Sequence, residues 1–414
     1  MVTGLALVLT FGVGIGVGRF ALPAVGGVGG TTPDPTDAQS SDAFALIGDA
    51  WEILHEKYVG ASELDDTALA YGAIEGLTDA VGDTGHTSFL TPQEREERAQ
   101  ELSGSYVGIG VRIDAAEDGR PLIVGVFRGS PAESGGLRPG DIIVAVDGVE
   151  TADQDLDDVA TRIRGEPGST VRLTIQAGLD GPEREVSLER AEVDVETVSW
   201  VMVPGSNTAV LRLEQFSNGS ADEIKAALQE IRAAGADRVV FDLRGNPGGF
   251  VNEAIGVANQ FLSGGTVFVE RDASGKETTH PVSPDGVATD LPLVVLVDRS
   301  TASSAEIVSG ALQDAARGQL IGVTTYGTGT VLGEFPLPDG SALRVGTVEW
   351  LTPSGRRIWH EGIVPDVIVE RPDDVRPLVP DDLRTMTPAQ AGDLTDPQLA
   401  RALTVVANAT SPAT

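Results

Sequence analysis

The spacing of hydrophobic and polar positions changes several times along this chain of 414 residues. A first stretch has helical spacing, with Phe44, Ile47 and Trp51 on one face, and short alternating runs broken by Gly, Pro and Asp follow it. Apolar runs then alternate with amphipathic segments, which predicts a mostly parallel sheet with crossover helices. The expected pieces are an N-terminal helical cap at 42–102, a β-rich module at 103–190, an α/β core at 191–371 and a tail at 372–414.

The same patterns predict individual elements. Functional residues of a parallel sheet gather beyond the carboxyl ends of its strands, so chemistry is expected after residues 243 and 297. One amphipathic helix is expected in the tail, around 398–406. The predicted strands are 107–113, 122–127, 142–146 and 171–176 in the module and 208–213, 238–243 and 291–297 in the core, with core helices at 221–233, at 251–262 and after residue 303.

The beginning of the chain predicts export. Residues 1–22 are expected to be a signal peptide or membrane anchor, because positions 2–18 are continuously apolar or small and end at Arg19. A linker at 23–41, rich in Pro, Asp and Ser, separates this segment from the rest. A buried glycine-rich segment of the fold is the alternative, which the polar linker disfavours. The first interpretation predicts an extracytoplasmic protein that is periplasmic, at the cell surface or secreted, with residues 2–18 as a candidate membrane anchor.

Composition and charge exclude several kinds of function. A net charge of −33 repels nucleic-acid phosphates and anionic lipid surfaces, so no nucleic-acid partner is expected. The chain has no cysteine for a thiolate nucleophile or a zinc–thiolate site, and its four histidines are too scattered for a recognisable metal motif. We therefore expect neither a metal nor another cofactor. Length and a 41% hydrophobic content suit two or three globular domains.

The most suggestive chemistry follows the apolar strand at 291–297, where a turn of small residues leads into a helix. Ser303 falls at or near the helix N-terminus, where unpaired N–H groups and the helix dipole would face an oxyanion. Thr301, Ser303 or Ser304 could instead simply cap the helix, and this segment alone does not exclude that role. The strand at 238–243 ends in Gly-Asn-Pro-Gly-Gly at 245–249, where glycine allows close approach to a ligand. An ordinary strand-to-helix turn is the alternative there.

The β-rich module closely resembles a PDZ domain. The resemblance rests on Tyr-Val-Gly-Ile-Gly at 106–110, Gly-Ser-Pro-Ala at 129–132 and Gly-Gly-Leu-Arg-Pro-Gly-Asp at 135–141. It implies that the first of these loops offers backbone N–H groups to the C-terminal carboxylate of a peptide, while the adjoining strand edge pairs with that peptide. The alternative is that these glycines only serve β-turns. The expected peptide-binding residues are Tyr106, Val107, Gly108, Ile109 and Gly110.

Together, the motifs between 42 and 371 resemble those of the C-terminal processing peptidases, tail-specific serine endopeptidases with an embedded PDZ domain. Asp-Leu-Arg-Gly-Asn-Pro-Gly-Gly at 242–249 and Thr-Ala-Ser-Ser-Ala-Glu-Ile at 301–307 carry the resemblance. It implies a crotonase-like or ClpP-like parallel-sheet α/β protease core with the nucleophile at Ser303. It also implies an oxyanion hole made by the backbone N–H of Ser304 and of Gly248 or Gly249.

One departure from this family concerns the general base. The family's lysine lies in a Gly-Lys-Gly-Thr-Val segment followed by a glutamine, whereas this chain reads Tyr-Gly-Thr-Gly-Thr-Val-Leu at 326–332. Thr328 therefore stands at the vacated lysine position, and its hydroxyl is far too weak a base. Lys57, Lys225 and Lys276 are the only lysines, and none is near this segment in sequence. The usual Ser–Lys dyad is excluded at its usual position.

His86 is the candidate replacement for the lysine. Gly-His-Thr at 85–87 resembles a loop of the tricorn-like and retinoid-binding-protein-like branch of the superfamily, whose enzymatic members use Ser–His chemistry. In that branch a downstream glutamate orients the histidine, and Glu361 matches it best, with His360 as an alternative base. The alternatives are a solvated His86 and a Glu361 that only pairs with a nearby arginine. Glu306 is either an acid that complements the helix dipole or a group with a direct catalytic role.

Two functions from different classes follow. The first is an exported or membrane-tethered serine endopeptidase that captures unfolded or C-terminally exposed proteins and peptides through its PDZ domain and cleaves them with Ser303 activated by His86. The second is a non-catalytic peptide-binding scaffold that has lost the general base. The sequence does not indicate an oligomeric state.

Overall fold

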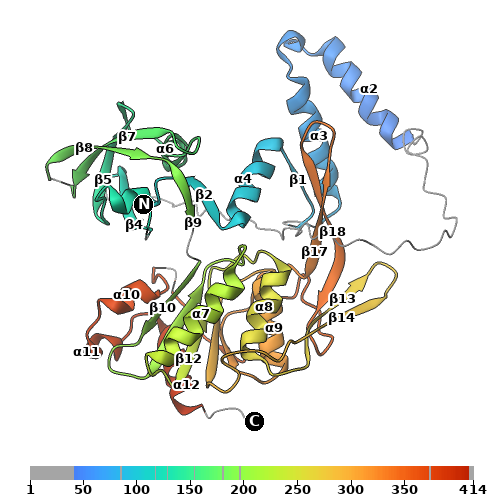
Figure 1. The fold of residues 1–414 in the computed structure, drawn as a ribbon. Helices are drawn as coiled ribbons and strands as arrows, with labels where there is room; N and C mark the ends of the chain where they lie inside the picture. The colour runs from blue at the N-terminus through green and yellow to red at the C-terminus, as the bar shows by residue number, and fades with distance from the viewer. Residues whose placement is uncertain are drawn as a thin grey trace.

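The structure, a computed structural model, describes residues 42–83, 86–116, 118–127, 129–152, 154–179, 181–194, 197–372 and 374–409 (Figure 1). The predicted signal or anchor at 1–22 and the linker at 23–41 lie outside these residues. Within the described ranges, no helix has the length and hydrophobicity needed to cross a membrane. The same ranges contain no group of three or more His, Asp or Glu side chains that could hold a metal ion.

A six-stranded sheet forms the centre of the α/β core, in the order β10-β11-β12-β15-β16-β19. All neighbours are parallel except β10 and β11, which confirms the mostly parallel sheet predicted from the sequence. All five residues of β15 are buried, as expected for a β-branched strand covered on both faces. The strands are β10 (Val198–Met202), β11 (Thr208–Leu213), β12 (Arg238–Asp242), β15 (Leu293–Val297), β16 (Gln319–Gly322) and β19 (Val367–Ile368).

Helices cover both faces of this sheet, so alternate residues of its strands pack into two separate hydrophobic cores. Phe241 and Val295 belong to one core, with residues of α7 (Ser220–Ala233), α8 (Val251–Phe261) and α9 (Ser304–Asp314). Val240 and Leu296 belong to the other, with residues that follow position 377. In Figure 1, α7, α8 and α9 lie together in front of the sheet.

The second face is covered by the segment that the sequence analysis treated as a tail with one helix. The predicted number of helices is wrong, because the segment forms α10 (Pro380–Arg384), α11 (Pro388–Ala391) and α12 (Pro397–Asn408). The first two are too short to show a helical period in sequence. The segment is also tied to the core by a fully buried ion pair of 2.7 Å between Arg244 and Asp396. It is therefore a structural layer of the core.

A second sheet joins the core to the N-terminal region, in the order β1-β18-β13-β14, with β17 also paired to β18. Its strands are β1 (Ser88–Leu90), β13 (Thr266–Asp272), β14 (Glu277–Pro281), β17 (Thr330–Pro336) and β18 (Ala342–Leu351). β1 comes from the region predicted to be a helical cap, and Ser88 pairs with Arg344 of β18. A strand of three residues shows no detectable hydrophobic period in the sequence, so β1 is defined only by its pairing with β18. This pairing brings His86 to the core.

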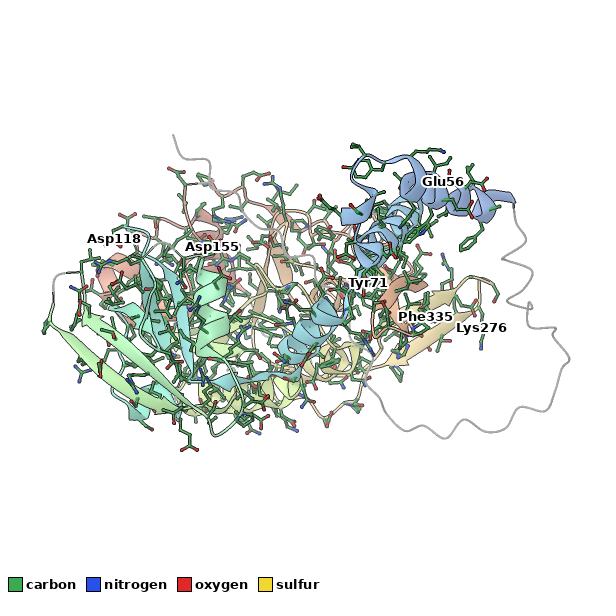
Figure 2. The ribbon with its side chains drawn as sticks, turned by 90° about the horizontal axis from the view of Figure 1, so that it is seen from above. Glu56, Tyr71, Asp118, Asp155, Lys276 and Phe335 are labelled. Atoms are coloured by element: carbon green, nitrogen blue, oxygen red, sulfur yellow. The ribbon has the colours of Figure 1, made fainter. Side chains whose placement is uncertain are left out.

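The rest of the N-terminal region is helical, as predicted. Its elements are α2 (Asp42–Lys57), the 3₁₀ turn η1 (Ala61–Glu63), α3 (Asp66–Ala80) and α4 (Pro92–Ser103). Asp65 caps α3, and Thr91 and Glu94 form a capping box for α4. Tyr71 of α3 donates a hydrogen bond of 2.9 Å to Asp339 in the β17–β18 turn, and Figure 2 shows it beside that hairpin. α2 extends away from the core (Figure 1).

The β-rich module contains a sheet in the order β3-β4-β5-β7-β8, with the short β6 paired to β5. The predicted strand at 107–113 is interrupted at Ile109 and Gly110, because Gly110 has a φ of +82°. Its first half, β2 (Ser105–Gly108), pairs with β9 (Ala191–Asp194) where the module joins the core. The module elements are β3 (Val111–Ala115), β4 (Pro121–Val126), α5 (Pro131–Ser134), β5 (Asp141–Val146), β6 (Val149–Glu150), α6 (Leu156–Ile163), β7 (Thr170–Ala177) and β8 (Glu183–Glu189).

Candidate active site

Ser303 lies in a strained turn between β15 and α9. Its φ of +56° and ψ of −121° form a conformation that residues with a side chain rarely adopt. The turn is held by Thr301, whose hydroxyl donates to the Leu243 carbonyl at 2.9 Å. Such strain persists only where the surroundings impose it, and it is concentrated at functional sites.

The hydroxyl groups of this turn do not cap α9. The Glu306 N–H donates to the Ser303 carbonyl at 2.8 Å, so the first helical turn does not use the Ser303 side chain. The Ser304 hydroxyl donates to the Gly249 carbonyl at 2.9 Å. Ser303 Oγ is fully buried and has no hydrogen-bond partner among the described residues. A buried hydroxyl without a partner costs about 1–3 kcal/mol, so the fold leaves this group available at a stability penalty.

The glycines after β12 lie directly against Ser303. A Cβ on Gly248 would come within 2.6 Å of Ser303 Cβ, and Gly248 and Gly249 have φ values of +100° and +140°. The Gly248 N–H is already used, because it donates to Asn246 Oδ1 at 2.8 Å. The N–H groups of Gly249 and Ser304 have no acceptor within the described part of the chain. Of the three predicted oxyanion donors, these two are therefore not used by any residue that the structure describes.

His86 is buried between the N-terminal region and the core, with only 3% of its surface exposed. Its Nδ1 lies 3.0 Å from Asp83 Oδ1, and Asp83 also accepts hydrogen bonds from the Thr87 hydroxyl and from Trp359 Nε1. An ionised carboxylate only accepts, so in the neutral imidazole Nδ1 carries the proton and Nε2 carries the lone pair. Nε2 is buried and has no partner among the described residues. This is the protonation pattern that a general base requires.

The electrostatics of His86 keep the imidazole neutral. Burial is the largest effect and lowers the pKa of His86 below its ordinary value of 6.5, and the nearby Arg344 also lowers it. Asp83 opposes this by stabilising the imidazolium. The pKa of Asp83 is itself lowered, because its hydrogen bonds and the neighbouring His86 outweigh its burial. Asp83 is therefore charged, and His86 is unprotonated at neutral pH.

The structure does not place Glu361 at His86. Glu361 is exposed, and its carboxylate makes no hydrogen bond or ion pair with any described residue. Asp83 takes the position predicted for Glu361, because its carboxylate lies against Nδ1 and its carbonyl accepts the His86 N–H at 3.1 Å. The indication in the sequence was an acidic residue, Asp83, three positions before His86. His360 packs edge-on against His86, with ring centroids 5.7 Å apart, but half of its side chain is exposed.

The loop at 325–328 lies between the two candidate catalytic groups. The Tyr326 ring packs edge-on against His86 at 5.9 Å, and the Tyr326 N–H donates to the Thr301 carbonyl at 2.9 Å. The structure therefore brings His86 and Ser303 to the same loop. It does not join them by a hydrogen bond, since both Nε2 and Oγ lack a partner among the described residues.

Glu306 clamps this loop to the serine turn. Its fully buried carboxylate accepts the N–H of Ser303 at 2.9 Å, of Gly327 at 2.7 Å and of Thr328 at 2.9 Å, as well as the Thr325 hydroxyl. Burial raises the pKa of Glu306, and the four hydrogen bonds oppose that effect. All of its acceptor capacity is used to position backbone. Glu306 is thus a positioning residue with no free atom for chemistry.

Thr328, at the predicted lysine position, is buried, and its N–H is held by Glu306. None of the three lysines lies on this loop: Lys57 ends α2, Lys225 lies on α7 and Lys276 lies on the β13–β14 hairpin, where Figure 2 shows it.

The predicted peptide-binding loop is buried and closely packed at its glycines. Gly108, Ile109 and Gly110 are buried, and a Cβ on Gly110 would come within 2.2 Å of Ser130 Cβ. Downstream, β3 is the last strand of its sheet, so one edge is unpaired by any described strand. Such an edge can take up an extended peptide.

Comparisons with known proteins agree with this architecture. A family described as peptidase family S41 matches residues 207–369, and a PDZ domain family matches residues 122–177. The chain is 31% identical over 341 residues to the carboxy-terminal processing protease CtpB of Bacillus subtilis, covering 81% of this chain and 70% of that protein. It is 36% identical over 327 residues to the carboxyl-terminal-processing protease of Synechocystis, covering 78% and 76%. A solved structure from Bacteroides fragilis under the S41 protease name shares the fold, with a TM-score of 0.53, 18% identity and coverage of 86% and 96%.

Proposed function

Because the chain belongs to peptidase family S41, as a carboxyl-terminal processing serine protease with a PDZ domain, we propose that it cleaves peptide bonds with Ser303 as nucleophile and His86 as general base. The observation that carries this proposal is the state of His86. Its Nδ1 is held by a buried carboxylate and its Nε2 is free of any described partner, in a protein whose usual lysine position is Thr328.

The reaction follows from these groups. His86 Nε2 takes the Ser303 proton as Oγ attacks the carbonyl carbon of the substrate, and Asp83 stabilises the imidazolium that forms. The free N–H groups of Gly249 and Ser304 stabilise the oxyanion. His86 then gives the proton to the leaving amine, and a water molecule activated by the same imidazole hydrolyses the acyl-enzyme.

Catalysis by this route requires a closing movement of the loop at 325–328 or of the His86 turn, because His86 and Ser303 are not in hydrogen-bond contact. Catalytic hydrogen bonds often form only in the substrate complex. The same observation favours a second candidate function, a peptide-binding scaffold without turnover. The missing lysine also supports it, whereas the strained Ser303 and the free N–H groups support the enzyme.

The deciding experiment measures hydrolysis of an unfolded protein by the full chain and its variants. We expect Ser303→Ala and His86→Ala each to lower the rate by orders of magnitude, and a fluorophosphonate probe to label Ser303. His55→Ala, which changes a histidine on the exposed helix α2, is the matched control. His360→Ala tests the alternative base. Wild-type rates in His86→Ala would refute the assignment of the base, and tight peptide binding with neither turnover nor labelling would establish the scaffold.

We also propose that the PDZ module captures exposed C-termini of substrates and that the protein works outside the cytoplasm. The loop at 106–110 with the free β3 edge supports the first statement, and the apolar segment at 2–18 supports the second. Fractionation of cells that express the full chain tests the location. Recovery only in the cytoplasmic fraction would contradict export.

A further inference from the structure

The strand β10 is the last strand of the core sheet, and its outer edge pairs with no other described strand. Just before it, the Thr197 carbonyl accepts the Glu214 N–H at 2.8 Å, and just after it, the Val203 N–H donates to the Thr208 carbonyl at 2.9 Å. In an antiparallel pair these orientations alternate, so the odd-numbered residues of β10 bond to β11. The residues whose N–H and C=O groups face outward are Val198, Trp200 and Met202.

Few of these outward groups have a partner. Within the described residues, the Trp200 carbonyl accepts Arg384 Nη2 at 3.0 Å, and no other outward N–H or C=O group of β10 is bonded. The Arg384 side chain is 54% exposed, so it can leave the edge without disturbing the core. A sheet edge with open donors and acceptors pairs readily with another extended chain. β10 is therefore a template for such a chain.

The same strand forms one wall of a groove of about 1110 Å³ between the core and the β-rich module. The helix α7 contributes Glu223, Ala226, Ala227 and Glu230, whose spacing of three or four positions places them on one face. From the module, Phe127 lines the groove just after β4. In Figure 1, β10 and α10 lie at one side of the core, below the module. A chain paired with β10 would thus have side-chain contacts on both sides.

The lining of this groove is acidic. It contains five carboxylate side chains and two arginines, and each arginine is already paired with one of the carboxylates. Glu230 is exposed, and the one group that it binds among the described residues is Trp200 Nε1, at 2.9 Å. An arginine side chain can pair with this carboxylate and pack on the indole. The charge therefore favours a basic segment and repels a second copy of this chain, whose net charge is −33.

We propose that the edge of β10 is a second peptide-binding site, which pairs with an extended, basic segment of the substrate polypeptide. Backbone pairing needs no free C-terminus, so this site differs in its ligand from the carboxylate site proposed for the PDZ module. The proposal rests on the polypeptide substrates of the proposed function. It does not depend on the catalytic roles of Ser303 and His86.

The position of this edge sets the spacing between the basic segment and the cleaved bond. β11 and β12 lie between β10 and β15, the strand that leads to Ser303. Neighbouring strands are about 4.8 Å apart, so a strand added to β10 lies roughly 19 Å from β15. An extended chain advances about 3.3 Å per residue, so the segment should lie about six or more residues from the cleaved bond.

The binding test uses the full chain with Ser303→Ala, so that peptides are bound without being cleaved. The probe is a fluorescein-labelled eight-residue peptide of alternating Arg and Val with a C-terminal amide, and the same peptide with Glu in place of Arg is its control. Anisotropy should show saturable binding of the arginine peptide alone. N-methylation of all its arginines, or instead of all its valines, blocks the N–H groups of one edge of the peptide. One of these two peptides should bind at least about ten-fold more weakly than the other, since each hydrogen bond contributes about two- to ten-fold.

Variants of the protein locate the site. Val198→Pro removes an outward N–H at the first residue of β10, where proline preserves the bonds to β11, and should weaken binding by about two- to ten-fold. Glu230→Gln should weaken it by roughly two- to five-fold. Glu56→Gln removes the same charge from the exposed helix α2 and is the matched control, with little change expected (Figure 2). Melting temperatures confirm that each variant is folded.

Three results would overturn the proposal. They are equal affinities of the two N-methylated peptides, equal effects of Glu230→Gln and Glu56→Gln, and a dimer of the chain that Val198→Pro converts to a monomer, which would show that a second copy occupies the edge. Kinetics of the active chain separate this proposal from the catalytic one. For a substrate with a suitably placed basic segment, Val198→Pro should raise KM by about two- to ten-fold and leave kcat unchanged. An unchanged KM with normal turnover would refute the β10 site alone, whereas absence of turnover in the unmodified chain would refute the catalytic proposal.

Discussion

Replacement of Asp83 by Asn is the sharpest test of the site that the fold assembles. The substitution preserves size and one acceptor oxygen but removes the negative charge that faces His86 Nδ1 at 3.0 Å. It also allows the amide group to face the imidazole, which favours the wrong tautomer. We expect a large loss of kcat and a small change in KM, since Asp83 acts on the imidazolium that forms in the transition state.

The size of the loss follows from the burial and separation of the two groups. Asp83 and His86 have only 8% and 3% of their side chains exposed, so solvent screens their interaction weakly. Two unit charges about 4 Å apart interact by about 4 kcal/mol at an effective dielectric constant near 20. Since the Asn retains part of the hydrogen bonding, a net loss of about 3–4 kcal/mol is expected, which corresponds to a fall in kcat of between about 10² and 10³.

Steady-state hydrolysis of a fluorogenic peptide across pH 5 to 9 provides the assay. The base must be neutral, so activity falls as pH drops through the pKa of His86. Asp83 raises that pKa, so Asp83→Asn should move the acid limb to lower pH while lowering the plateau. Glu361→Gln is the control and should stay within two-fold of wild type. Near wild-type activity in Asp83→Asn, or a large loss in Glu361→Gln, would refute the assignment of Asp83 as the residue that orients His86.

Two further predictions concern residues around the same site. Arg344 is buried, its pKa is lowered to about 9 mainly by that burial, and its charge lowers the pKa of His86. Arg344→Gln should therefore move the acid limb of the pH profile to higher pH, and a shift to lower pH would contradict this. Glu306→Gln places an amide donor against the N–H of Gly327 or against those of Ser303 and Thr328. The lost hydrogen bonds should reduce the free energy of unfolding by about 1–3 kcal/mol and the melting temperature by about 2–10 °C. Differential scanning calorimetry measures this, and an unchanged melting temperature would show that the clamp is unimportant.

Much of the core followed from local pattern. β11 has the predicted bounds, and β12, β15, α7 and α8 agree with prediction to within two residues. β1 and the helices α10 and α11 were not found, because elements of three to five residues show no period and form only against partners distant in sequence. The family motifs also led to Ser303, Gly249 and Ser304, which the fold brings into contact.

Two details of the site could not be derived from the sequence. Glu361 was expected at His86 and Asp83 was missed, although Asp83 is three residues away, because the matching motif located a glutamate and gave no information on which carboxylate lies against Nδ1. The capping role of Ser303 could not be excluded in sequence either. It depends on the Ser303 carbonyl accepting the Glu306 N–H, and only backbone dihedral angles determine that.

Contiguous residues were enough to predict the mostly parallel sheet and the PDZ module. They also identified Ser303 as the candidate nucleophile and Thr328 at the expected lysine position, because each of these features lies within one short segment of sequence. The tertiary structure decided which carboxylate holds His86, which N–H groups remain free, and that Glu306 ties the Thr328 loop to the serine. These depend on contacts between segments that are distant along the chain, such as the hydrogen bond between Asp83 and Trp359, which lie 276 positions apart. Local periodicity carries no information at that range, since packing alone selects which buried donors and acceptors meet.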